Sequence, residues 1–264
     1  MTTFALPAPS LVGADVLKLR KRRGLSAVVG LLTVVAVVLT YGISELLHVT
    51  NPGANGPAGG VTNIGHGMFL LSALGAVAAS IVAATVGAGD RDAGVYRELV
   101  VTGRSRVQLF LARIPAGWAY LFPFVAAAYA LMAVAGVVFA GGNPMPDTRL
   151  LVLGGLWTVL QVAFYYLLAV GIATLAGSRS YTIAIVLAFR LVLTPIVAGI
   201  SSLGVVRELV PAVALQKLAP GSFKMAVRMF PDVGISLAAT VAVLVAWIAI
   251  AVCLGAWRDT TSDA

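Results

Sequence analysis

Charged side chains are scarce in this sequence. Of its 264 residues only 11% are Asp, Glu, Lys or Arg, whereas 60% are hydrophobic, and the mean hydropathy is +0.99. Soluble domains carry about 25% charged residues, so this chain lacks the polar side chains that would cover a soluble surface. Its apolar stretches are long and unbroken, without the alternation of apolar and polar residues that is typical of strands in membrane β-barrels. The composition therefore excludes an ordinary soluble domain and predicts helices that span a bilayer, which satisfy their own backbone hydrogen bonds.

Residues that bind metals or carry out hydrolysis are also few. Cys253 is the single cysteine, so no intrachain disulfide forms, and His48 and His66 are the only histidines. Two histidines are too few for a typical zinc or copper site, and we interpret them as polar residues at the membrane interface. The motifs H-E-x-x-H, G-x-S-x-G and G-x-x-x-x-G-K-[ST] are missing. We therefore predict no catalytic residue, metal or cofactor in this chain, and expect any ATP hydrolysis on another one.

Six apolar stretches are long enough to cross a bilayer, which takes roughly 20 helical residues. They cover residues 25–47, 67–89, 115–140, 150–176, 181–203 and 233–257. The first is too long for a cleaved signal peptide, so we assign it as a span. We predict an all-α integral membrane protein with a single transmembrane domain, residues 1–264.

The basic residues predict the orientation of these spans. The net charge is +8, but the Lys and Arg residues cluster beside apolar spans, which indicates membrane topology and not nucleic-acid binding. Twelve of the 18 fall on one side and five on the other, with Arg190 inside a span. The richer side is expected to be cytoplasmic, which places both termini in the cytoplasm.

Three segments outside the spans are more than simple turns. Residues 1–24 form a cytoplasmic tail, in which apolar residues followed by four basic ones predict an amphipathic helix on the membrane surface. Residues 90–114 mix charged and apolar side chains, a pattern that indicates a short cytoplasmic helix entering the third span. Residues 204–232 contain three prolines between apolar pieces too short to cross, which predicts short re-entrant helices at the outer side. Residues 258–264 form a second cytoplasmic tail.

The segment after the second span reads DRDAGVYRELVVTGRSRVQLFLAR from Asp90 to Arg113. It resembles a cytoplasmic segment of the permease subunits of ABC-2-type transporters. The family segment has the form E-R-E-x-G-T-x-E-x-L-L-x-T-P-x-S-R, followed by a distal lysine. Val95 replaces the family threonine, Arg97 stands where glutamate is usual, and Gly103 replaces the proline. The residues ADVLKLRKRRG ahead of the first span are similar to the family's surface helix. Together with the six spans, the cytoplasmic termini and the outer re-entrant segment between the fifth and sixth spans, the resemblance covers nearly the whole chain.

This resemblance implies the permease subunit of an ATP-driven ABC exporter in a cell membrane, which we expect to be prokaryotic. Two copies of the chain, or one copy and a homologous permease, would form the pathway, and ATP and Mg would bind to separate ATPase subunits. Residues 90–114 would be the coupling helix that docks on the ATPase. The implied coupling residues are Asp90, Arg91, Asp92, Arg97, Glu98, Thr102, Arg104 and Arg106. A solvated basic loop is the alternative interpretation of this segment.

Polar side chains inside the spans are the candidates for lining a pathway. They are Gln161, Tyr165, Tyr166, Arg190 and Thr194. Gln161 and Tyr165, four residues apart, share one helix face. These residues serve either substrate contact or hydrogen bonding between helices, and both interpretations stay open.

Arg190 is the most unusual of these residues because it lies near the middle of its span. Insertion of an arginine there costs at least about 2.5 kcal/mol, and no carboxylate is expected at the same depth. Compensation is expected from carbonyls near Pro195, an oxygen of Gln161 or a tyrosine, an aromatic ring, water, or an anionic substrate.

Two functions of other classes remain as alternatives. The first is an integral membrane enzyme built on the buried polar residues, against which stands the lack of paired carboxylates in the spans. The second is a non-transporting anchor or sensor for an ATPase partner. The sequence does not specify a substrate.

Overall fold

The structure is a computed structural model, and it describes residues 9–94, 98, 101, 105–221 and 234–261. Every regular element in these ranges is a helix. Six helical segments are long and apolar enough to span a membrane, and the prediction of an all-α chain with six such helices is confirmed. They are Arg23–Thr50, Val61–Asp92, Arg106–Val138, Thr148–Ala176, Arg179–Gly199 and Leu237–Thr261.

Two of the spans are interrupted by a π-helical turn. The first consists of α2 (Arg23–Gly30), the π turn η1 (Leu31–Val35) and α3 (Ala36–Thr50). The fifth consists of α8 (Arg179–Ala188), the π turn η2 (Phe189–Leu193) and α9 (Thr194–Gly199). Pro195 explains the second interruption, because proline has no N–H to donate to the preceding turn. Such turns occur frequently at functional sites, and η2 contains Arg190.

The remaining spans are continuous helices with defined ends. They are α4 (Val61–Asp92), α6 (Arg106–Val138), α7 (Thr148–Ala176) and α12 (Leu237–Thr261). At the start of α7 the side chain of Asp147 accepts a hydrogen bond of 2.8 Å from the backbone N–H of Leu150. The helix ends at Gly177, whose φ of 65° is the left-handed conformation that glycine adopts readily.

The two ends of the predicted cytoplasmic segment belong to the neighbouring spans. Asp90 and Asp92 belong to the last turns of α4, and residues 106–114 form the first turns of α6. Ser105 caps α6 by accepting a hydrogen bond from the backbone N–H of Gln108. Residues 90–92 and 106–114 therefore continue the second and third spans directly, and the described residues Glu98 and Val101, between them in sequence, are also helical.

The connection before the last span contains two short helices. They are η3 (Ser201–Leu209) and α10 (Pro211–Lys217). Trp157 of α7 donates a hydrogen bond to the carbonyl of Leu215, and Trp247 of α12 donates one to the carbonyl of Leu209. Both helices therefore pack against the spans. That they form a re-entrant segment, which dips into the outer side of the bilayer, stays a prediction.

The helices α4 and α7 form the centre of the bundle. The most apolar window of each is 61% buried, compared with 17–28% in the other four spans. On its other side α7 lies close to α12, because Gly171 faces the backbone of Ala251 and any side chain at that glycine would overlap it. Small residues that allow backbones to approach are typical of helix contacts in membranes.

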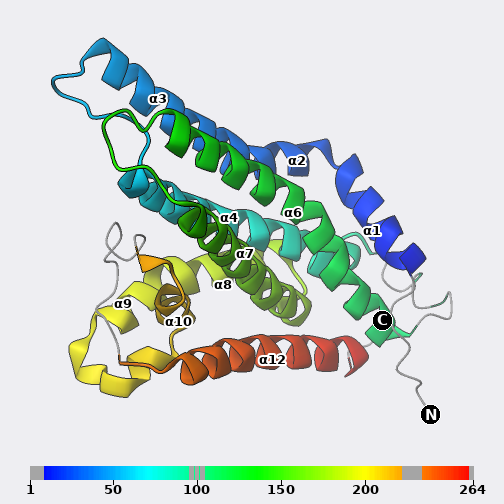
Figure 1. The fold of residues 1–264 in the computed structure, drawn as a ribbon. Helices are drawn as coiled ribbons and strands as arrows, with labels where there is room; N and C mark the ends of the chain where they lie inside the picture. Colours follow the sequence, from blue (N-terminus) through cyan, green and yellow to red (C-terminus); the bar gives the residue numbers. More distant parts are fainter. Residues whose placement is uncertain (1–8, 95–97, 99–100, 102–104, 222–233, 262–264) are drawn as a thin grey trace.

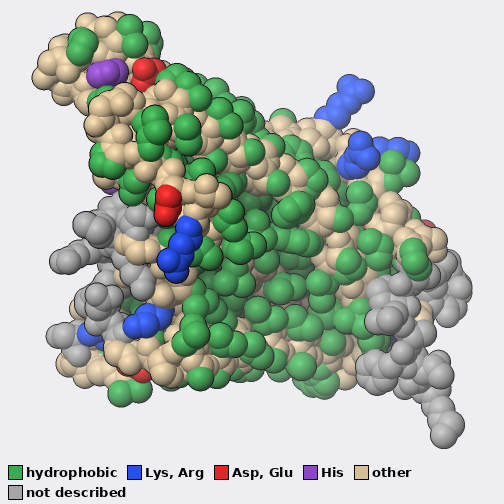
Figure 2. All heavy atoms as spheres, in the orientation of Figure 1, with side chains coloured by type: hydrophobic (Ala, Val, Ile, Leu, Met, Phe, Trp, Pro, Cys, Tyr) green, Lys and Arg blue, Asp and Glu red, His purple; other side chains and the backbone are tan. Residues whose placement is uncertain are grey.

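The molecule has two distinct ends (Figure 1). At the first, which we call the charged end, lie α1 (Pro9–Lys21), the last turns of α4, α7 and α12, and the first turns of α6 and α8. At the opposite one, the loop end, lie residues 51–60, 139–147 and 200–210. Figure 2 shows that charged side chains on one face gather towards these ends and that apolar side chains cover the region between them. This distribution is the one expected of a membrane-spanning chain.

Candidate functional site

Two carboxylates in the last turns of α4 bind basic residues of other helices at the charged end. Asp90 accepts a hydrogen bond from the ammonium group of Lys18 on α1. The Oδ2 atom of Asp92 lies 3.2 Å from Nε of Arg179, the first residue of α8. These pairs connect the second span to the N-terminal helix on one side and to the fifth span on the other.

A third carboxylate, that of Asp259 near the end of α12, is completely buried. Its Oδ1 atom lies 2.7 Å from Nη2 of Arg91 and 3.5 Å from Nη1 of Arg113. Arg91 also donates from Nη1 to the carbonyl of Thr174 in the last turn of α7, at 2.8 Å. Because burying a charged group is costly unless it is paired and hydrogen-bonded, these arginines stabilise the Asp259 side chain in its buried position. This cluster joins α4, α6, α7 and α12.

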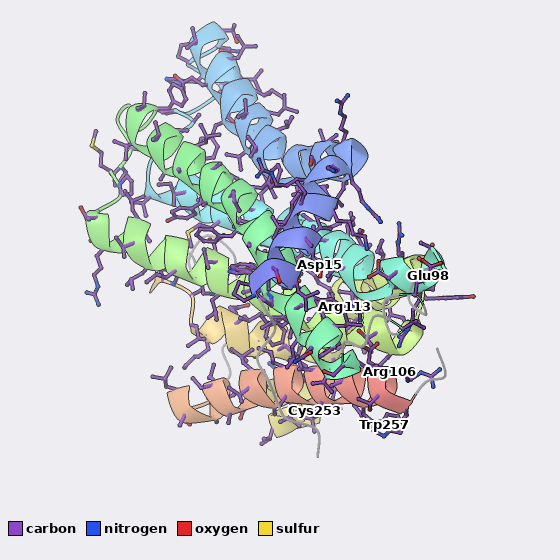
Figure 3. All side chains as sticks on the ribbon, turned by 90° about the vertical axis from the view of Figure 1, so that its right-hand side faces the viewer. Asp15, Glu98, Arg106, Arg113, Cys253 and Trp257 are labelled. Atoms are coloured by element: carbon purple, nitrogen blue, oxygen red, sulfur yellow. The ribbon has the colours of Figure 1, made fainter. Side chains whose placement is uncertain are left out.

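Asp15 of α1 lies beside this network. Figure 3 looks onto the charged end and shows Asp15 close to Arg113 of α6. Burial raises the pKa of the Asp15 carboxyl above its ordinary value, and the negative charge of Asp90 raises it further, while Lys18 and Arg113 oppose the shift. The N-terminal helix is therefore electrostatically coupled to the start of the predicted coupling segment.

The structure brings together some of the predicted coupling residues and separates others. Asp90, Arg91 and Asp92 each contact a different part of the bundle through the pairs described above. Arg106 donates from Nη1 to the carbonyl of Thr260 at 3.3 Å, and Figure 3 shows it near the end of α12, whereas Glu98 lies at the periphery. Arg97, Thr102 and Arg104 lie outside the described residues. Docking of an ATPase on this segment stays a prediction.

Sequence reasoning did not identify two partners in this network, Asp259 and Arg179. Both lie at the ends of spans, where a charged residue is ordinarily explained by contact with water. The sequence contained one signal for Asp259. Acids are rare in this chain, 10 in 264 residues, so an acid directly after an apolar span is a candidate for an ion pair with a basic residue.

A second polar cluster lies inside the membrane-length part of the bundle, around Arg190. The Nη2 atom of Arg190 donates a hydrogen bond of 3.0 Å to the carbonyl of Ser72 on α4. Its Cζ atom lies 4.3 Å from the centroid of the Tyr165 ring on α7. Two of the expected kinds of compensation, a backbone carbonyl and an aromatic ring, are therefore present. The carbonyl belongs to α4 and not to the segment around Pro195.

Three polar atoms associated with this cluster are buried and have no hydrogen-bond partner among the described residues. They are Oε1 of Gln161, Oη of Tyr165 and Oγ1 of Thr194. Gln161 and Tyr165 lie one turn apart on α7, Arg190 and Thr194 lie one turn apart on the fifth span, and the contact of Arg190 with Tyr165 joins the two pairs. Because buried polar groups are rarely left unpaired, this arrangement offers hydrogen-bonding positions to a bound polar or anionic group.

Tyr166, the remaining pathway candidate, lies apart from this cluster. Its hydroxyl donates a hydrogen bond of 2.7 Å to the carbonyl of Arg113, and its ring packs against Gly117 of α6. Since this hydroxyl is used in a contact between α6 and α7, the geometry gives Tyr166 a role in helix packing.

In the part of the chain that is described, no three His, Cys, Asp or Glu residues form a group that could hold a metal ion. No family model matches the sequence, and no curated protein matches it either.

The helices and contacts described above define an all-helical, multi-pass membrane protein with two polar clusters, one at the charged end and one within the bundle.

Proposed function

We propose that this chain is the membrane-spanning permease subunit of an ATP-driven exporter of the ABC-2 type. It acts as a homodimer or with a homologous permease, and separate ATPase subunits supply the energy. The observation that supports this function best is the connection of residues 90–92 to four other helices through Lys18, Arg179, Thr174 and Asp259. A displacement of the docking segment is thereby passed to the N-terminal helix and to the fourth, fifth and sixth spans.

The fifth span provides a route from the charged end to the cluster around Arg190. Arg179 holds the start of α8 against Asp92, and Arg190 lies about 16 Å farther along the same helical segment at 1.5 Å per residue. In the proposed mechanism, closure of the ATPase subunits tilts this span and changes the surroundings of Arg190. The cluster accordingly serves as the position where substrate is held.

Docking of the ATPase is tested with two charged residues of the coupling segment, Glu98 and Arg104. Glu98→Ala combined with Arg104→Ala is expected to reduce co-purification of an ATPase encoded beside this chain several-fold, because both side chains are charged members of the coupling segment. Insertion into the membrane should be unchanged. Arg149→Ala, which removes an exposed arginine at the loop end, is the matched control.

Two outcomes contradict this picture in different ways. Unchanged complex yield and ATP hydrolysis in the double variant place the docking contact elsewhere on the chain. If the purified chain binds no ATPase at all, the permease function is wrong, and the membrane enzyme becomes the better hypothesis.

Orientation is tested by single-cysteine labelling in a Cys253→Ser background. Ala54→Cys places a thiol in the exposed loop between the first two spans, and Ser262→Cys places one after the last span. An impermeant maleimide applied to intact cells is expected to label Ala54→Cys and to leave Ser262→Cys unmodified, because the charged end carries the excess of Lys and Arg. The reverse pattern means that the protein has the opposite orientation.

A further inference from the structure

An apolar pocket of about 200 Å³ lies where the fifth span, the connection after it and α12 meet. Its walls come from η2, α9, η3, the start of α10 and the middle of α12, and include Phe189, Leu193, Val206, Leu209 and Trp247. The pocket shares Thr194 with the cluster around Arg190, but its apolar walls lie outside that cluster. A ligand in the pocket does not depend on the permease function.

The pocket is held open by fixed contacts on one side and bordered by exposed apolar side chains on the other. The rings of Phe189 and Trp247 are 5.3 Å apart between centroids, and Trp247 donates a hydrogen bond of 2.9 Å to the carbonyl of Leu209. Leu193, Val206 and Leu209 are each more than half exposed at the rim. In a membrane-spanning chain, a rim of this kind is continuous with the lipid-facing surface.

One polar side chain lines this otherwise apolar pocket. Thr194 is 2% exposed, and its Oγ1 atom has no hydrogen-bond partner in the described part of the chain. A buried hydroxyl without a partner is unfavourable. It therefore points to a ligand that carries an oxygen as well as apolar groups.

We propose that this pocket binds the alkyl chain of a membrane lipid, and that the hydroxyl of Thr194 donates a hydrogen bond to an ester or hydroxyl oxygen of that lipid. A methylene group is about as large as a water molecule, which occupies about 30 Å³ in the liquid. The pocket volume of about 200 Å³ therefore accommodates roughly seven methylene groups. Water does not fill an apolar cavity of this size stably. The bilayer, in contrast, supplies alkyl chains at high concentration directly at the apolar rim.

The occupant is tested with a phosphatidylcholine that carries a diazirine on one acyl chain, incorporated into phosphatidylcholine nanodiscs containing the full chain. After irradiation, labels are expected to concentrate on peptides of α9 and α12. Val206→Trp fills the mouth of the pocket and should reduce this labelling at least fivefold. Val205→Trp is the matched control, because Val205 is the more exposed neighbour, at 73%, and does not line the pocket.

The part assigned to Thr194 is tested with Thr194→Val, which removes the hydroxyl while keeping the shape of the side chain. Labelling by the phosphatidylcholine probe should fall several-fold, whereas an alkyl diazirine without oxygen should label both proteins equally. Equal labelling by phosphatidylcholine contradicts the proposed hydrogen bond.

Two further results overturn the lipid site itself. Labels spread evenly over all exposed apolar faces and insensitive to Val206→Trp mean ordinary lipid contact only. If the pocket is not labelled and Val206→Cys in a Cys253→Ser background instead forms cross-links between two copies, the occupant is a second copy of this chain.

Discussion

Arg190→Ala is expected to reduce transport, or substrate-stimulated ATP hydrolysis, by about tenfold or more, while membrane insertion and basal ATP hydrolysis are retained. The guanidinium group is held by the carbonyl of Ser72 and the ring of Tyr165, on two different helices. No carboxylate is paired with it among the described residues, so its positive charge is available to a substrate. A hydrogen bond to a charged group contributes about 1.5–3 kcal/mol. Losing one such bond to the substrate therefore corresponds to the expected reduction of about tenfold or more.

The conservative variant and a control make this experiment decisive. Arg190→Lys should retain part of the activity, because the charge remains but the planar fork of donors is lost. Arg149→Ala serves as the control for removal of an arginine elsewhere. Full transport by Arg190→Ala would exclude a role in the pathway, and failure of the variant to accumulate in the membrane would show that Arg190 is structural.

The largest loss of stability is expected at the charged end, from Asp259→Ala. This substitution leaves the guanidinium groups of Arg91 and Arg113 without the buried carboxylate between them. Removing one partner of a buried ion pair typically costs about 3–5 kcal/mol. Thermal unfolding of the detergent-purified chain should therefore begin at a clearly lower temperature.

Two comparisons separate this effect from a general disturbance of the helix end. Arg258→Ala changes the adjacent exposed residue and should leave the unfolding temperature nearly unchanged. Asp259→Ala combined with Arg91→Met should recover part of the lost stability, because one buried positive charge is removed as well. An Asp259→Ala protein that unfolds together with the Arg258→Ala protein is incompatible with a stabilising role of this carboxylate.

The spans were predictable from the sequence because length and hydropathy are local properties. The network at the charged end was not, since Asp90 and Lys18 are 72 positions apart, and Arg91 and Asp259 are 168 apart. Pairing over such distances depends on how the helices pack, and a single sequence carries no record of that. The π turn at residues 189–193 had a partial signal in Pro195.

The surroundings of Arg190 were predictable in kind but not in identity. The scarcity of acids in the spans indicated that a carbonyl, a side-chain oxygen, an aromatic ring, water or an anionic substrate compensates the charge of Arg190. Every residue carries the same backbone carbonyl, however, so the sequence did not indicate that of Ser72 in particular. The apolar pocket was beyond prediction altogether, because its walls come from separate segments between Phe189 and Trp247.

The position of Asp259 also bears on how the protein is assembled during synthesis. Spans enter the membrane in chain order, so Arg91 and Arg113 emerge from the ribosome long before α12 supplies their carboxylate. Until α12 is inserted, both guanidinium groups lack this carboxylate. Insertion of α12 then adds the buried ion pair, so the contacts of Asp259 with the second and third spans form only after translation of the sixth.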